Sequence, residues 1–238
     1  MITHGSDAVG TWPFDPFTFK QWSKRDPRRL AFVAWSRLQE QWSRSRFDRF
    51  QIPLRSTNLL GTPLIYEQTD TAVTLEQAAL LIAALHSTEH MLEPVVEVGC
   101  YRGVTTTLLA TNTTRRFIGV DPFAGYGGAE QDLKIFQDRV ENITNLIHLR
   151  CTSGEAARQL IDDRFSLVFI DAIHDYVNVR FDSIAWCSLL QKNGLIAFHD
   201  TDNPKFAGTR RAVFELMRGR FLGLEEHVEN LVILRKLA

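Results

Sequence analysis

Two short stretches of the sequence hold side chains that could do acid–base or metal chemistry. Asp171 and His174 follow one apolar run, and His199 and Asp200 directly follow another. A carboxylate beside an imidazole can orient a general base, and the same groups are ligands for divalent metals. Because both runs are typical of buried strands, we expect all four side chains at the carboxyl ends of neighbouring strands.

A glycine-containing loop after an earlier apolar run predicts a binding site for a nucleoside. In VVEVGCYRGVTT (95–106), Gly99 and Gly103 allow a tight turn and a close approach of the next helix, and Glu97 places an acid beside it. The next apolar run ends at Asp121, where an acid commonly hydrogen-bonds the hydroxyls of a ribose.

The ligand that suits this loop carries no phosphate. A dinucleotide site places glycine where Tyr101 stands, so that the pyrophosphate can touch the backbone. S-adenosylmethionine tolerates a side chain there, and its cationic ammonium and sulfonium suit Glu97. Ser153 opens a later helix, either as its N-cap alone or also as a partner of the adenine edge. We expect the cofactor to be held by Glu97, Gly99, Tyr101, Gly103, Asp121, Ser153 and Asp171.

Short apolar strands alternate with helices through the second part of the chain. Continuous apolar strands are typical of a parallel sheet that is buried on both faces. Two further runs, 221–225 and 231–234, are too close for a helical crossover and predict an antiparallel hairpin. The expected fold is α/β, a doubly wound, mostly parallel seven-stranded sheet. The expected strands are 95–98, 117–120, 146–149, 167–170 and 195–198, and the helices are 104–110, 129–140, 155–161 and 176–190.

Composition excludes several classes of function. The 238 residues carry a net charge of −1, with a pI of about 6.7, so no global positive field for nucleic acid exists. Three widely spaced cysteines predict neither disulfides nor a zinc site, which favours a reducing cytoplasm. No apolar stretch reaches the length of a membrane span.

The first 70 residues differ in composition from the rest, and we divide the chain into 1–70 and 71–238. The segment from Lys20 to Arg55 contains ten Lys and Arg but three Asp and Glu, and aromatic residues are interspersed among them. Asp26-Pro27 predicts a helix start. An apolar stripe at helical spacing is expected on its buried face, formed by Leu30, Val33 or Ala34, Leu38 and Trp42. This segment would be a lid or a homodimer contact; RNA binding is the alternative.

The second segment opens with a helix, which a capping box at 74–77 predicts.

Over residues 75–238 the sequence resembles a known family. The stretches EVGCYRGVTT, GVDPFAG and FIDAIHDYVNVRFDSIAWCSLLQKNGLIAFHDT are similar to class I S-adenosylmethionine-dependent methyltransferases, in particular to the small-molecule O-methyltransferases of the antibiotic-sugar and catechol types. The resemblance implies a small hydroxylated acceptor, such as a sugar or natural-product intermediate. In metal-dependent members, Mg²⁺ is held by three acids, which implies a metal set of Asp171, His199 and Asp200. His199 stands where an acid is usual, which favours a softer divalent ion.

Other interpretations stay open at this point. Without a metal, His174 or His199 would be the general base, oriented by Asp171 or Asp200, and the acceptor could be oxygen or nitrogen. Transfer of an aminopropyl group from the same cofactor is another alternative. Tyr101 argues against an NAD-dependent oxidoreductase. A catalytically silent module that binds RNA or a protein through its basic segment is disfavoured by the retained acids. The glycine-rich loop 123–128 is expected to move over the ligand.

Overall fold

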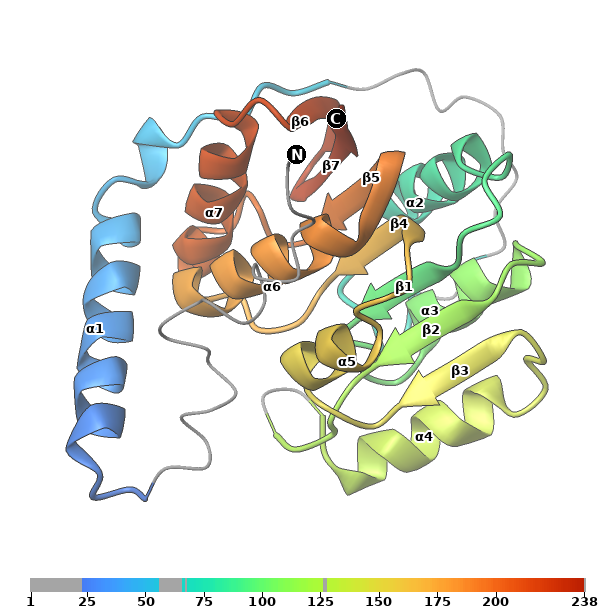
Figure 1. Ribbon diagram of the computed structural model, residues 1–238, viewed down its shortest axis with the longest axis horizontal. Coiled ribbons are helices and arrows are strands. Elements are labelled where there is room, and N and C mark those ends of the chain that lie inside the picture. Colours follow the sequence, from blue (N-terminus) through green and yellow to red (C-terminus); the bar gives the residue numbers. More distant parts are fainter. Residues whose placement is uncertain (1–22, 56–65, 67, 126–127, 238) are drawn as a thin grey trace.

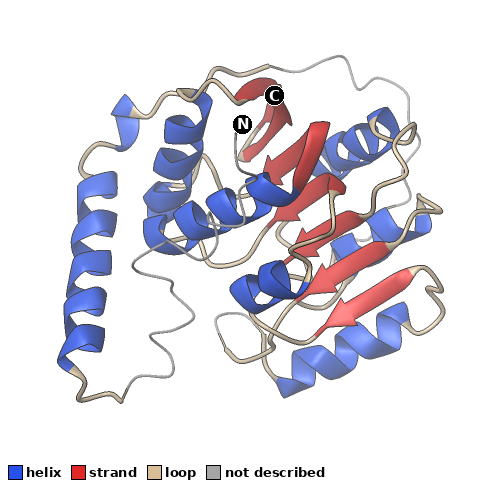
Figure 2. Ribbon diagram, in the orientation of Figure 1, coloured by secondary structure: helices blue, strands red, loops and turns tan. Residues whose placement is uncertain are grey.

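The chain forms a seven-stranded sheet with helices on both faces (Figures 1 and 2). A computed structural model describes residues 23–55, 66, 68–125 and 128–237. The strand order is β3-β2-β1-β4-β5-β7-β6, and only β7 runs antiparallel to its two neighbours. The strands are β1 (Val95–Val98), β2 (Phe117–Val120), β3 (Leu146–Leu149), β4 (Phe165–Ile170), β5 (Leu190–Phe198), β6 (Leu222–Val228) and β7 (Leu231–Lys236).

Alternate residues of the strands pack into two separate cores. Along β1, Val96 and Val98 join side chains of the helices on one face, and Val95 joins those on the other. The first face is covered by α5 (Ser153–Gln159), α6 (Tyr176–Leu189) and α7 (Ala207–Met217), and the second by α2 (Leu75–Ser87) and α3 (Val104–Thr111). The helix α4 (Glu130–Val140) packs beside α3.

The expected fold is confirmed, with differences at the ends of elements. Strands β1, β2 and β3 have the predicted bounds, whereas β4 begins two residues earlier and β5 at Leu190. Helix α7 was not predicted. The terminal hairpin is present, and its turn consists of Glu229 and Asn230. No helix among the described residues is both long and apolar enough to span a membrane.

The N-terminal helix α1 (Pro27–Arg44) begins at its predicted cap but buries a different face. Asp26 accepts a hydrogen bond from the Arg28 N–H, with proline at the first helical position. The predicted stripe was wrong, since Leu30 and Leu38 are 58% and 62% exposed. Phe32 is buried instead, because that face meets α6 and α7. Of the 1–70 segment, residues 1–22, 56–65 and 67 lie outside the described residues.

Contacts of Trp42 and Glu40 hold α1 against α7 and α6. The Arg211 guanidinium of α7 lies 4.1 Å from the ring centroid of Trp42 and 3.6 Å from that of Tyr176. The Glu40 carboxylate accepts a hydrogen bond from the Tyr176 N–H at 3.3 Å, at the start of α6. A negative charge at a helix N-terminus is stabilising, so the contact orients α1.

Candidate active site

A cavity of about 630 Å³ opens at the carboxyl ends of β1, β2 and β4, where the sheet order reverses direction. Its described lining contains no lysine or arginine. Such a lining is repulsive for phosphate and attractive for a cation. The acids that line it are Asp70, Glu97, Asp121, Asp171 and Asp182.

The loop after β1 requires its glycines. Gly99 has φ +96°, and a Cβ there would lie 2.2 Å from the Asp171 carbonyl oxygen at the end of β4. Gly103 has φ +78°, and its Cβ would lie 2.9 Å from the Phe136 ring of α4. The two glycines therefore bring β1, β4 and α4 together around the cavity.

Asp121 fixes the same loop from the end of β2. Its Oδ2 accepts hydrogen bonds from the N–H groups of Cys100 and Tyr101, both at 3.0 Å, and its Oδ1 from that of Phe123 at 2.8 Å. Tyr101 has φ +46° and lies 37% exposed on the cavity lining. Asp121 thus shapes the loop and still faces the cavity.

Glu97 is buried beneath the loop, and Thr106 donates a hydrogen bond to it. Burial raises the pKa of its carboxyl well above the ordinary value, and the neighbouring charges of Asp171 and Asp121 add to the effect. A cation in the cavity would lower that pKa again. The site therefore gains electrostatically from a positively charged ligand.

At the opposite end of the cavity, the N-cap prediction for Ser153 was wrong. Thr152 caps α5 in a capping box with Glu155, and the Ser153 hydroxyl points to α6 instead. It donates to Oδ1 of Asp182 at 2.5 Å and accepts from Nε1 of Trp186 at 2.9 Å. Asp182 was not foreseen, because it is one of several polar residues within the sequence of α6.

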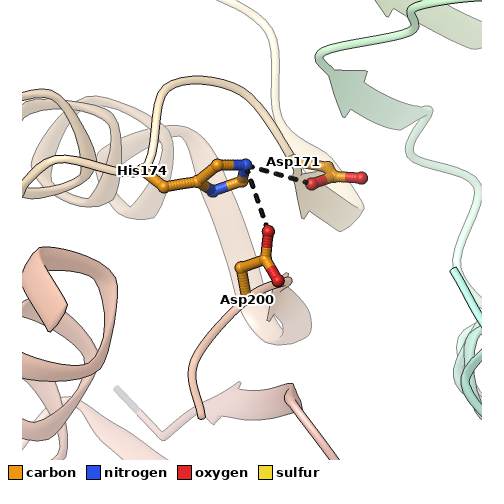
Figure 3. Close-up of side chains that lie close together, drawn as sticks. All are labelled: Asp171, His174 and Asp200. Carbon is orange, nitrogen blue, oxygen red and sulfur yellow. Dashed lines mark ion pairs between the residues drawn. The ribbon is translucent and has the colours of Figure 1, made fainter. Parts of the chain in front are cut away.

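Asp171, His174 and Asp200 lie close together (Figure 3), and the first two line the large cavity. Nε2 of His174 lies 3.7 Å from Oδ1 of Asp171 and 3.4 Å from Oδ2 of Asp200. One ligand atom from each residue lies within 4.8 Å of the other two. Asp200 has φ +57°, a conformation uncommon for a non-glycine residue, which is typical of functional sites. We name these residues the Asp171–His174–Asp200 cluster.

His199 lies behind the cluster rather than in it. It is 1% exposed, and its Nδ1 lies 3.1 Å from Oδ1 of Asp171. Its Nε2 lies 3.1 Å from Oε1 of Gln77, an oxygen that already accepts the Thr74 N–H. Nε2 must therefore donate, which leaves no lone pair there for a metal or a proton.

The charge state of His199 agrees with two donated hydrogen bonds. Burial works to lower the pKa of His199, but the carboxylate of Asp171 outweighs it, so the pKa is raised. Burial likewise works to raise the pKa of Asp171, and the charge of His199 outweighs it, so that pKa is lowered. The contact between the two side chains therefore favours the protonated form of His199 and the ionised form of Asp171.

Two residues distant in sequence complete the support of the acids. Gln77 donates from Nε2 to Oδ1 of Asn230, and Nδ2 of Asn230 donates to Oδ1 of Asp200 at 2.9 Å. With His199, these side chains connect the two carboxylates through a continuous chain of hydrogen bonds. No local sequence signal marks Gln77 or Asn230 as part of this site. Their partners here lie more than one hundred residues or a whole strand away in the sequence.

His174 also lines a second cavity, of about 460 Å³, on the side of α1. Glu40 and Arg44 of α1 form one wall, and Lys205 and Phe206 form another. The Phe206 ring centroid lies 4.6 Å from that of His174. Only His174 of the cluster faces both cavities, together with its neighbours Ala172 and Ile173.

Comparisons with known proteins agree with this architecture. An O-methyltransferase from Bacillus cereus, solved in complex with SAH, is 13% identical, with a TM-score of 0.57 over 97% of this chain and 100% of that one. CalS11, a TDP-rhamnose 3'-O-methyltransferase of calicheamicin biosynthesis, is 17% identical, with a TM-score of 0.54 over 91% and 97%. An rRNA methylase from Streptococcus thermophilus is 17% identical, with a TM-score of 0.51 over 67% and 96%.

At these identities the solved structures show a shared fold and do not identify the methyl acceptor of this chain. No curated protein sequence matches the chain. Residues 96–201, from β1 to the residue after Asp200, match the methyltransferase domain family Methyltransf_24. That match spans the strands that build the cavity, and the solved structures share the fold around it. The chain therefore contains an S-adenosylmethionine-dependent methyltransferase domain.

Proposed function

We propose that this enzyme transfers the methyl group to a hydroxyl oxygen of a small molecule. The observation that carries the proposal is the position of His174, which lines both cavities beside two carboxylates. The large cavity would hold the methyl donor and the small one the acceptor. The acceptor hydroxyl would then lie at the cluster, between the two ligands.

The charges of the large cavity support the placement of the donor. Glu97 would face the ammonium of the aminoacyl end, while Asp121 would accept hydrogen bonds from the ribose hydroxyls. Asp121 retains acceptor capacity for this, because a carboxylate offers about four lone pairs and backbone N–H groups use three of them. Gly99, Tyr101 and Gly103 would form the wall of backbone beside the donor.

In-line methyl transfer needs an acceptor oxygen that is deprotonated and close to the methyl carbon. The cluster offers two carboxylates and one imidazole within 4.8 Å, a donor set that fits a divalent ion. The mixed oxygen and nitrogen ligands favour Mn²⁺ or Fe²⁺ over Mg²⁺. When bound, such an ion lowers the pKa of a coordinated hydroxyl. His174, rather than the expected His199, would be the nitrogen ligand.

General-base catalysis by His174 is the second candidate, on the same geometry. Its Nε2 faces both Asp171 and Asp200, which would stabilise the imidazolium formed when it takes the hydroxyl proton. His199 is not available for that role, since both of its ring nitrogens face partners.

The acceptor class rests on the small cavity and on the solved relatives. A volume of about 460 Å³ suits a sugar or an aromatic alcohol better than a macromolecule. CalS11 acts on TDP-rhamnose, which supports a sugar or natural-product acceptor for this enzyme. The segment 1–70 would close over that cavity as a lid or contact a second copy; Glu40 and Arg44 of α1 lie in its wall.

Methyl transfer to a panel of sugars, catechols and amines, with labelled donor, tests the proposal. Hydroxylated compounds should be methylated and matched amines should not. Chelation followed by addition of Mn²⁺ or Mg²⁺ separates the two mechanisms: a metal enzyme loses activity and recovers it best with Mn²⁺. Activity that is insensitive to chelation but lost in His174→Ala supports the general base. Methylation of amines alone contradicts an oxygen acceptor.

A further inference from the structure

Asp182 is a buried acid whose hydrogen-bonding capacity is not used up within the protein. It is 2% exposed, lies on α6, and lines the large cavity together with Thr152, Ser153 and Asn178. Among the described residues, only Ser153 donates a hydrogen bond to its carboxyl. Buried carboxyls are normally saturated with partners, so this one has room for a ligand.

The adjacent Ser153 cannot donate a hydrogen bond to that ligand. Its single proton is donated to Asp182, and one of its lone pairs accepts from Nε1 of Trp186. The hydroxyl therefore fixes the orientation of the Asp182 carboxyl. Trp186 in turn is fully buried, which makes the whole arrangement rigid.

The order of groups along the cavity decides which part of the donor reaches Asp182. Glu97 lies on β1, Asp121 follows β2 and α5 follows β3, and the strand order β3-β2-β1 places these three strand ends in a row. With Glu97 at the aminoacyl end and Asp121 at the ribose, the lining that remains is that of α5 and α6. This step rests on the proposed placement of the donor. The remaining part of S-adenosylmethionine is adenine, whose edge carries an exocyclic amine as donor next to a ring nitrogen as acceptor.

We propose that the Asp182 carboxyl recognises the adenine of the methyl donor by accepting a hydrogen bond from its exocyclic amine. The carboxyl accepts in either protonation state. Burial raises its pKa to about 7, with a smaller contribution from Asp175, so near neutrality it is also partly in the acid form. That form adds an O–H that can donate to the ring nitrogen beside the amine.

Calorimetry with two ligands tests this contact: S-adenosylhomocysteine, and its analogue with unsubstituted purine in place of adenine. The wild type should bind the analogue about ten- to a hundredfold more weakly, since an unpaired buried acceptor costs about 1–3 kcal/mol. In Asp182→Leu and Asp182→Ala, both ligands should bind equally. Asp182→Asn keeps a carbonyl acceptor and should keep most of the discrimination.

The ratio of the two affinities separates recognition from a merely structural role. If Asp182 only docks α5 on α6, both ligands weaken together in the Leu and Ala variants and the wild-type ratio persists, which overturns the inference. A wild type that binds both ligands equally overturns it as well, and this measurement needs no variant. If the wild type binds neither ligand, the placement of the donor fails instead.

Discussion

Nδ1 of His199 lies 3.1 Å from Oδ1 of Asp171, although only Asp171 borders the large cavity. The buried imidazole thus controls a cavity residue from behind. Its other nitrogen donates to Gln77, so the ring is held at both ends. His199 therefore acts as a positioning residue for Asp171, and the position where related metal enzymes carry an acid has a different task in this chain.

We expect the ring of His199 to keep its second proton to a higher pH than an ordinary histidine does. The Asp171 carboxylate outweighs burial and raises its pKa above the ordinary value of 6.5, so this contribution to stability is complete below pH 6.5 and is lost as pH rises through the folded pKa. Long-range ¹H–¹⁵N spectra report the charge directly. A ring that loses its second proton at or below pH 6.5 would contradict the assignment, and His199→Leu identifies the signal.

Asp121→Asn should weaken the binding of S-adenosylhomocysteine about ten- to a hundredfold. The amide group places an NH₂ against backbone N–H donors that the carboxylate now accepts, which costs about 1–3 kcal/mol and also disturbs the ribose contact. Calorimetry measures the loss. Asp138→Asn, an exposed change on α4, is the control. Equal affinities for both variants would refute the role of Asp121.

The buried Asp182 should make the protein less stable as pH rises from 4 to 7. Its pKa is 3.8 in the unfolded chain and about 7 in the fold, because of burial above all, so over this range the folded state holds a proton that the unfolded state has released. The free energy of unfolding should fall by up to about 4 kcal/mol from this group. Urea titrations at pH 5 and pH 8 should show this decrease relative to Asp182→Asn. If the difference in free energy of unfolding between the wild type and Asp182→Asn were the same at both pH values, the prediction would be wrong.

Gly208→Ala should destabilise the protein, although alanine favours helices by about 1 kcal/mol. A Cβ at Gly208, in the first turn of α7, would lie 2.1 Å from the Tyr176 nitrogen and 2.5 Å from Oε2 of Glu40. The three helix ends would have to separate, at a cost of about 1–3 kcal/mol. Thermal unfolding measures it, with exposed Gln41→Ala on α1 as control. A gain in melting temperature would show that the junction is loose.

Local patterns predict the parts of this structure that depend on local physics. The strands β1 to β3 follow from short apolar runs between breakers, and Asp175 caps α6 as its position suggests. Thr152 and Glu155 also form a local capping-box pattern, which would have identified the true cap of α5. The amphipathic stripe of α1 could not be predicted, because the buried face depends on where α6 and α7 lie.

The supporting contacts of the site could not be read from the sequence for a similar reason. His199 and Asp200 are adjacent, and strand register decides which of the two side chains points toward His174. Asp200 belongs to the cluster, while the side chain of His199 lies behind it. Gln77 and Asn230 meet through a contact between α2 and the hairpin turn, 153 residues apart. Contacts at such separations depend on the complete topology.

Strand β7 lies between β5 and β6, so a segment late in the chain occupies an interior place in the sheet. During synthesis, β5 and its Asp200 leave the ribosome well before β7, and the Asn230 that supports Asp200 emerges just ahead of β7. A nascent chain can therefore form the cavity at the ends of β1, β2 and β4 early, while the Asp200 carboxylate still lacks its Asn230 partner. Binding of the methyl donor should precede competence for methyl transfer as the chain grows.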